Sequence, residues 1–168
     1  EMLRTDQAQA ATLGFAAGLA LEAALRQVSG DAVSFRLKWP NDLLVNGAKL
    51  AGILIEAEAT PEGLAALAGI GVNVVAAPED TPYPAVSLKA LGIGTDAPTL
   101  FAALSDAWAE WFALWDHGRG FATIRACWLA RAAGVGQPIE VRQGERVIEG
   151  VFETIDEAGR LVVSRGGE

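Results

Sequence analysis

The sequence has 168 residues, 51% of them hydrophobic, and its 13 basic and 21 acidic residues give a formal net charge of −8. This content fills the core of one full domain with a small appendage, and it excludes a disordered chain. Binding to a phosphate backbone needs the opposite charge balance, so we expect no nucleic-acid partner for this segment.

The chain contains one cysteine, Cys127, and one histidine, His117, so it can form no internal disulfide, and neither residue has the spacing of a metal site. Its apolar stretches are interrupted before they reach the roughly 18 residues that a membrane span requires. Residues 11–21 lack the basic lead-in and cleavage pattern of a signal peptide. We therefore expect a soluble protein of a reducing compartment, cytoplasmic by default and without membrane contact.

The first half of the chain predicts one helix followed by an antiparallel sheet. Residues 7–28 are rich in Ala and Leu at helical spacing, and Thr5 or Asp6 can cap this helix. The pair Asn46-Gly47 is typical of a two-residue hairpin turn, and residues 60–63 predict a second turn. The predicted strands are residues 33–38, 43–45, 50–58 and 64–75.

The second half predicts helices and then short strands. A proline-rich loop covers residues 76–86, a short helical piece lies near 87–91, and Pro98 opens a helix that precedes another at 121–133. Aromatic and leucine side chains at helical spacing in the Pro98 helix are interpreted as core: Phe101, Leu104, Trp108, Trp111, Phe112 and Trp115. The start of a small β-barrel is predicted from strands at 138–142, 146–155 and 160–164.

The stretch KWPNDLLVNGAKLAGILIEA, residues 38–57, gathers polar groups at one end of the predicted sheet. Those expected to share this end are Lys38, Asn41, Asp42 and Lys49. The small residues Ala51 and Gly52 beside them let a ligand lie against the backbone. A structural alternative stays open, in which the amide and carboxylate cap a turn and the second lysine is a solvated flank.

A second motif, GIGVNV at residues 69–74, places the amide of Asn73 among apolar neighbours. An unpaired buried amide costs about 1–3 kcal/mol, so this amide bonds either to backbone or to a ligand. Buried side-chain amides usually find protein partners, which favours the backbone.

Together the two motifs resemble the central domain of the biotin protein ligases, which attach biotin to carboxylase carrier domains. The helix before them, the tryptophan-rich helix after them and residues 131–163 also resemble that family. The resemblance implies an α+β fold in which helices pack on a mixed, largely antiparallel sheet of the biotin/lipoate ligase type. It implies a catalytic domain at 1–135, without its N-terminal part, and a partial C-terminal SH3-like β domain at 136–168.

The family reaction has two steps. The biotin carboxylate attacks the α-phosphate of ATP to form biotinyl-5'-AMP, and a lysine of the biotin carboxyl carrier protein of acetyl-CoA carboxylase then attacks the mixed anhydride. Both reactants of the first step are anions, so a cation must lie between them, and Mg²⁺ screens the remaining charge. Pairing through sheet edges in the family makes a homodimer plausible.

The resemblance implies roles for individual residues. Lys49 matches the lysine that contacts the biotin carboxylate and the phosphate, and Asp42, supported by Asn41, matches a carboxylate that orients or deprotonates the carrier lysine. Asn73 matches the residue that reads the adenine edge. The apolar bed for biotin is expected from Gly52, Leu54, Gly69 and Val72.

The sequence also departs from the family. A Gly/Arg-rich loop that closes over biotin, and a Ser/Thr-rich segment before it, do not occur in these 168 residues. We expect a truncated sequence rather than an evolved loss. Two alternatives stay open: a catalytically incomplete biotin-binding, nucleotide-binding or regulatory relative, and a ligase of the lipoate type.

Overall fold

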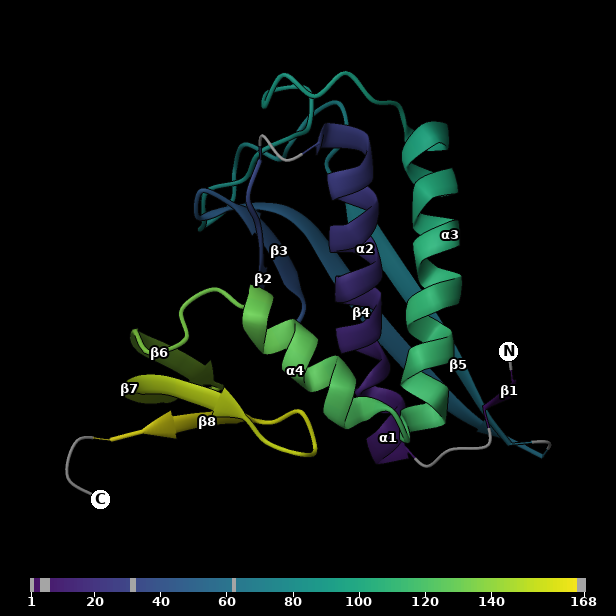
Figure 1. The fold of residues 1–168 in the computed structure, drawn as a ribbon. Coiled ribbons are helices and arrows are strands. Elements are labelled where there is room, and N and C mark those ends of the chain that lie inside the picture. Colours follow the sequence, from purple (N-terminus) through teal and green to yellow (C-terminus); the bar gives the residue numbers. More distant parts are fainter. Residues whose placement is uncertain (1, 4–6, 31–32, 62, 166–168) are drawn as a thin grey trace.

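The computed structural model describes residues 2–3, 7–30, 33–61 and 63–165, which form two antiparallel sheets and a layer of helices (Figure 1). The larger sheet has the order β1-β5-β4-β3-β2 and the smaller one the order β6-β7-β8. The strands are β1 (Met2–Leu3), β2 (Phe35–Lys38), β3 (Asp42–Val45), β4 (Ala48–Thr60), β5 (Gly63–Val72), β6 (Pro138–Gln143), β7 (Arg146–Ile155) and β8 (Leu161–Ser164). The helices are α1 (Gln7–Ala11), α2 (Leu13–Ser29), α3 (Ala97–Trp115), the short 3-10 helix η2 (Asp116–Gly118) and α4 (Phe121–Arg131).

The larger sheet confirms the predicted antiparallel arrangement. Asn46 and Gly47 both have positive φ, 51° and 81°, and join β3 to β4 in the predicted hairpin. Two strands are shorter than predicted, since β2 begins only at Phe35 and β5 ends at Val72. The chain leaves the sheet at Asn73, whose backbone N–H donates to the Leu50 carbonyl at 2.9 Å.

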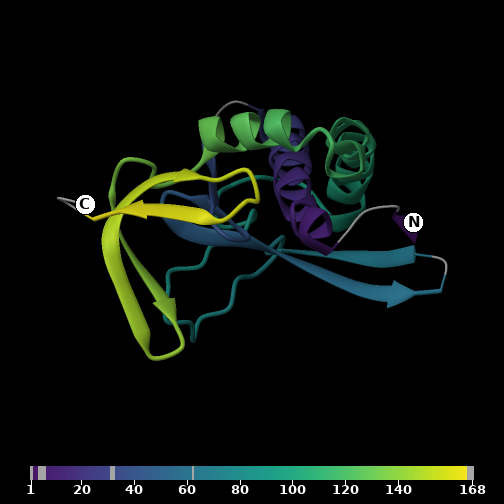
Figure 2. The same ribbon diagram turned by 90° about the horizontal axis from the view of Figure 1, so that it is seen from below.

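The helices lie on one side of the larger sheet, as Figure 2 shows. The predicted helix at 7–28 is interrupted at Thr12, whose hydroxyl donates to the Gln9 carbonyl and accepts from the Trp115 indole N–H at 2.8 Å. This local bond competes with the helical pattern and divides the segment into α1 and α2. The proposed caps Thr5 and Asp6 lie outside the described residues.

The predicted stripe of α3 packs on the core at every position except Phe101. Four of its members are partly buried against the core: Leu104, Trp108, Trp111 and Phe112. Trp115 is fully buried between α3 and α2, whereas Phe101 is 71% exposed. Phe101 lines an apolar groove between α3 and β5, a strand near the edge of the sheet, so its interpretation as core was wrong. The short helical piece predicted near 87–91 is a single hydrogen-bonded turn, in which the Leu91 N–H donates to the Ser87 carbonyl.

The smaller sheet packs against the helical layer through Phe152 and Ile155, both buried. Its three described strands form an open antiparallel sheet and close no barrel, and the sequence predicted only a partial one. The α+β class and the antiparallel sheets are as expected. Within the described part of the chain, no helix combines the length and apolar character needed to cross a membrane.

Candidate active site on the open face of the larger sheet

The described helices cover one face of β4 and β5, and we call the other the open face (Figure 2). Residues paired directly across two strands lie on the same face of a sheet. The pairs Gly52–Gly71 and Leu54–Gly69 therefore share the open face, together with Leu67. Leu54 is 58% and Leu67 63% exposed, and together they form an apolar floor next to three glycines. Glu56, the direct partner of Leu67, is exposed on the same face, at the end of the floor away from Lys49.

Val72 does not join this floor. It pairs with Ala51, which is buried, and its own side chain packs against the core under the helices. Of the four residues expected to hold biotin, Gly52, Leu54 and Gly69 lie together on the open face and Val72 lies on the opposite one. The difference follows from the two-residue period of a strand, because Gly69 and Val72 are three positions apart.

A β-bulge brings Lys49 to the open face. In a regular strand, Lys49 and Gly52 would point to opposite faces because they too are three residues apart. The pairing of β3 with β4 skips Leu50, however, and this extra residue turns the preceding side chain over. The Cε and Nζ atoms of Lys49 consequently lie 3.3 Å from the position that a Cβ on Gly52 would take.

Lys49 forms an ion pair with Asp42, with Nζ and Oδ1 2.5 Å apart. Asp42 is the direct partner of Gly52 across the two strands, so all three residues meet at one point of the open face. The side chains of Lys49 and Asp42 are 27% and 18% exposed, and water screens such a pair less than one on the surface.

Asn41 has a structural part in this arrangement. Its side-chain amide donates to the Ile53 carbonyl at 2.7 Å, and its backbone carbonyl accepts from the Ile53 N–H at 2.9 Å. These two bonds hold β4 against the segment that carries Asp42. Lys38, which pairs with Asp42 in the register of β2 and β3, is exposed.

The amide of Asn73 faces the loop that follows β5. Its Nδ2 donates to the Val86 carbonyl at 3.1 Å and, at 3.4 Å, to the Lys49 carbonyl. Of the two alternatives for this amide, backbone or ligand, the nitrogen therefore bonds to backbone. Only the Oδ1 atom of this side chain is left to accept a hydrogen bond from a ligand.

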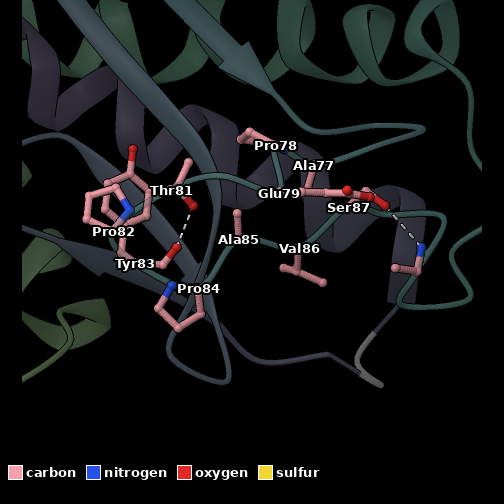
Figure 3. A pocket seen from close by; sticks show the side chains of 11 residues that line it. Ala77, Pro78, Glu79, Thr81, Pro82, Tyr83, Pro84, Ala85, Val86 and Ser87 are labelled. Atoms are coloured by element: carbon pink, nitrogen blue, oxygen red, sulfur yellow. Dashed lines mark hydrogen bonds between the residues drawn. The ribbon is translucent and has the colours of Figure 1, made fainter.

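The loop after β5 forms a pocket of about 660 Å³ between Ala77 and Ala90, and Figure 3 shows the side chains that line it. The loop is tied to the backbone of Lys49, since the Lys49 N–H donates to the Pro84 carbonyl and the Val86 N–H donates to the Lys49 carbonyl. The centroid of the Tyr83 ring lies 5.3 Å from Lys49 Nζ.

Sequence reasoning assigned no role to Tyr83. The available signal was a single tyrosine between two prolines, Pro82 and Pro84, in a loop that was predicted only as a connection. Nothing local in that pattern places the ring beside a lysine more than thirty residues earlier in the chain. The parallel bridge between Lys49 and Ala85 does so.

Two family models match the sequence. Residues 4–74 match the Biotin/lipoate A/B protein ligase family, and residues 134–168 match the Biotin protein ligase C terminal domain. The chain is 44% identical over 161 residues to a biotin--[acetyl-CoA-carboxylase] ligase of Paracoccus denitrificans, a match that covers 92% of this chain and 67% of the relative. It is 34% identical over 158 residues to the enzyme of the same name from Mycobacterium tuberculosis, covering 92% of this chain and 57% of the relative.

Among solved structures, the biotin protein ligase of Aquifex aeolicus in complex with biotin and ATP has a similar fold. The TM-score is 0.77 at 23% sequence identity, and the match covers 93% of this chain and 65% of that one. The chain thus spans between 57% and 67% of the length of these three proteins.

Proposed function

The chain belongs to the biotin protein ligase family, and from that membership we propose that the whole protein activates biotin with ATP and transfers it to a carrier lysine. The observation that supports this proposal most strongly is the meeting of Lys49, Asp42 and Gly52 at the end of an exposed apolar floor. At such a site the cation can pair with the carboxylate of a small acid while the apolar surface binds the rest of the molecule.

In the first step, an oxygen of the biotin carboxylate bonds to the α-phosphorus of ATP while the bond to pyrophosphate breaks. Both groups are anionic, so their approach costs electrostatic energy that a fixed cation offsets. We assign this role to the Lys49 ammonium. The apolar parts of biotin would cover Leu54 and lie against Gly52 and Gly69, burying surface that is exposed in the described chain.

In the second step, the amine of the carrier lysine attacks the carbonyl carbon, AMP leaves, and the nitrogen loses a proton. Asp42 would orient the amine and accept this proton. Its carboxylate is paired with Lys49, and it becomes available when the ammonium turns toward the anionic adenylate. Asn41 would support the step indirectly, through its two bonds to Ile53.

For the nucleotide, we propose that Asn73 contributes only as an acceptor. Its amide nitrogen is already bonded to backbone, so its Oδ1 would receive a hydrogen bond from the adenine amino group. Mg²⁺ would enter with ATP and screen the charge of its phosphates.

The acceptor is proposed to be the biotin carboxyl carrier protein of acetyl-CoA carboxylase, after the names of the relatives. A catalytic part at 1–135 and a C-terminal β part at 136–168 are supported by the two separate sheets. A cytoplasmic location stays a prediction from the cysteine content, and a homodimer stays a prediction from the resemblance.

The test is biotin-dependent release of pyrophosphate from ATP by the whole protein. Replacing Lys49 with Ala should lower the rate at least about 100-fold, as for removal of other transition-state charge contacts, with little change in the unfolding temperature. Lys89→Ala is the matched control, because Lys89 is exposed and lies outside the site. A wild-type protein that releases no pyrophosphate with biotin contradicts the proposed function. Release with lipoate instead would identify a lipoate ligase.

A further inference from the structure

The aromatic ring of Tyr83 is the feature of this site that the family assignment does not explain. Its centroid lies 5.3 Å from the Lys49 ammonium nitrogen, inside the range of about 6 Å over which an aromatic face attracts a cation. Tyr83 is 45% exposed, so the ring is in contact with the ammonium without filling a core.

Hydrogen bonds on both sides of Tyr83 hold the backbone of its loop in place. The carbonyl of Pro84, the next residue, accepts from the Lys49 N–H at 2.8 Å, and the Val86 N–H donates to the Lys49 carbonyl at 3.0 Å. On the other side, the Thr81 hydroxyl donates to the Tyr83 carbonyl at 2.6 Å (Figure 3). The loop and the lysine therefore share one backbone register, which places Tyr83 beside Lys49.

The ring and the carboxylate stabilise the ammonium in different ways. Asp42, 2.5 Å from Lys49 Nζ, carries a full negative charge that cancels the charge of the lysine and repels an incoming anion. The face of an aromatic ring attracts a cation through its quadrupole and carries no net charge. An ammonium beside the ring therefore keeps its attraction for phosphate and carboxylate groups.

We propose that Tyr83 is a positioning residue for Lys49, and this inference rests on the function proposed above. The ring holds the ammonium at the boundary between the open face and the pocket of the loop after β5. From there the lysine can leave Asp42 for the anionic substrates while it keeps one favourable contact. Tyr83 thus acts through Lys49 and takes no part in bond making itself.

The test compares Tyr83→Phe, which keeps the ring, with Tyr83→Leu, which keeps apolar bulk but has no aromatic face. Biotin-dependent exchange of pyrophosphate into ATP is measured with the whole protein, and kcat and KM are determined separately. Tyr83→Leu should lower kcat by about 3- to 30-fold, the range that corresponds to one cation–π contact, with a smaller change in KM for biotin. Tyr83→Phe should stay within about twofold of wild type, because the ring is retained.

Val75→Ala is the control for a general effect on the loop, since Val75 is an exposed apolar residue at its start and does not line the pocket. This variant should retain the wild-type kcat. If Tyr83→Phe loses as much activity as Tyr83→Leu, the hydroxyl matters and the ring does not, which overturns the proposal. Wild-type kcat in Tyr83→Leu overturns it equally.

A second measurement does not depend on activity. An aromatic face shifts the NMR signals of protons above it upfield, so the ε-methylene protons of Lys49 should be shifted upfield in wild type and in Tyr83→Phe. The signal is assigned by its loss in Lys49→Arg. In Tyr83→Leu it should return to the position of an ordinary lysine. An ordinary Lys49 signal in wild type contradicts the proposal about Tyr83, whereas a shifted signal in a protein that does not use biotin contradicts only the proposed function.

Discussion

Gly52 shows how little space surrounds the Lys49 ammonium. A Cβ at this position would lie 3.3 Å from both Cε and Nζ of Lys49, and 3.7 Å from Oδ1 of Asp42. These contacts are with the far end of a flexible side chain, so the fold can absorb an added methyl group by moving the lysine. The missing side chain at Gly52 therefore serves the placement of a charge rather than the stability of the sheet.

We predict that Gly52→Ala lowers the rate of biotin-dependent pyrophosphate release about tenfold or more, because reacting groups tolerate displacements of only a fraction of an ångström. The unfolding temperature should stay within a few degrees of wild type. Gly94→Ala is the matched control, since an added Cβ there meets nothing within 4 Å. An unchanged rate in Gly52→Ala would mean that the lysine adapts without cost.

At the level of elements, the turn between β7 and β8 of the smaller sheet contacts the segment between β2 and β3 of the larger sheet. The Trp39 indole N–H, next to the candidate site, donates to the Gly159 carbonyl at 3.0 Å. Gly159 has a φ of +78°, and a Cβ on it would lie 2.7 Å from the ring of Phe15 in α2. Phe15 in turn contacts Phe121 and Trp128 of α4 edge to face. The turn thus fits into an aromatic cluster beside the segment that carries Asp42.

We predict that Gly159→Ala destabilises the protein more than Gly144→Ala, and that the difference is about 1–3 kcal/mol, the usual cost of overpacking. Both glycines have positive φ, so each substitution also costs about 1–2 kcal/mol of backbone strain. Gly144 has no atom within 4 Å of an added Cβ and so reports the strain alone. Free energies of unfolding from urea titration give the comparison. Equal values for the two variants would show that the turn moves away from the Phe15 ring at no cost in stability.

For the whole molecule, the dependence of stability on pH follows from a few carboxyl groups that accept hydrogen bonds in the folded state. Among the described residues, three carboxyl groups have a pKa below their ordinary value of 3.8. A hydrogen bond from Thr99 at the start of α3 lowers the pKa of Asp96, one from the Arg119 side chain lowers that of Asp116, and one from the Arg160 backbone lowers that of Asp156. The folded state therefore favours the ionised form of each of these groups more strongly than the unfolded state does.

A lowered pKa contributes stability above the unfolded value and loses it as the pH falls through the folded value. We therefore predict that the unfolding temperature is nearly constant from about pH 6 to about pH 5 and declines below about pH 4. Asp156→Asn, which removes one of the three groups, should make this decline shallower. A curve of unfolding temperature against pH with the same slope in both proteins would contradict the assignment for Asp156.

Much of the architecture follows from local pattern. The Asn46-Gly47 turn, with an apolar run after it, predicted the central hairpin, and helical spacing predicted the long helices, because turn chemistry and side-chain period act over a few residues. The same patterns could not show that Thr12 interrupts the first helix, since that break involves Trp115, more than a hundred residues later. Nor could they show that Phe101 faces an open groove instead of the core.

The sequence predicted which residues make up the candidate site. Charged and amide side chains next to small residues within an apolar stretch are unusual enough to single out Lys49, Asp42 and Gly52. The sequence did not predict their arrangement. The β-bulge at Leu50 turned Lys49 onto the open face, strand period placed Val72 on the opposite one, and a loop paired with the lysine backbone delivered Tyr83. Residue types and short periods are properties of neighbours in sequence, whereas the face on which a side chain lies depends on the pairing of strands and loops that are far apart along the chain.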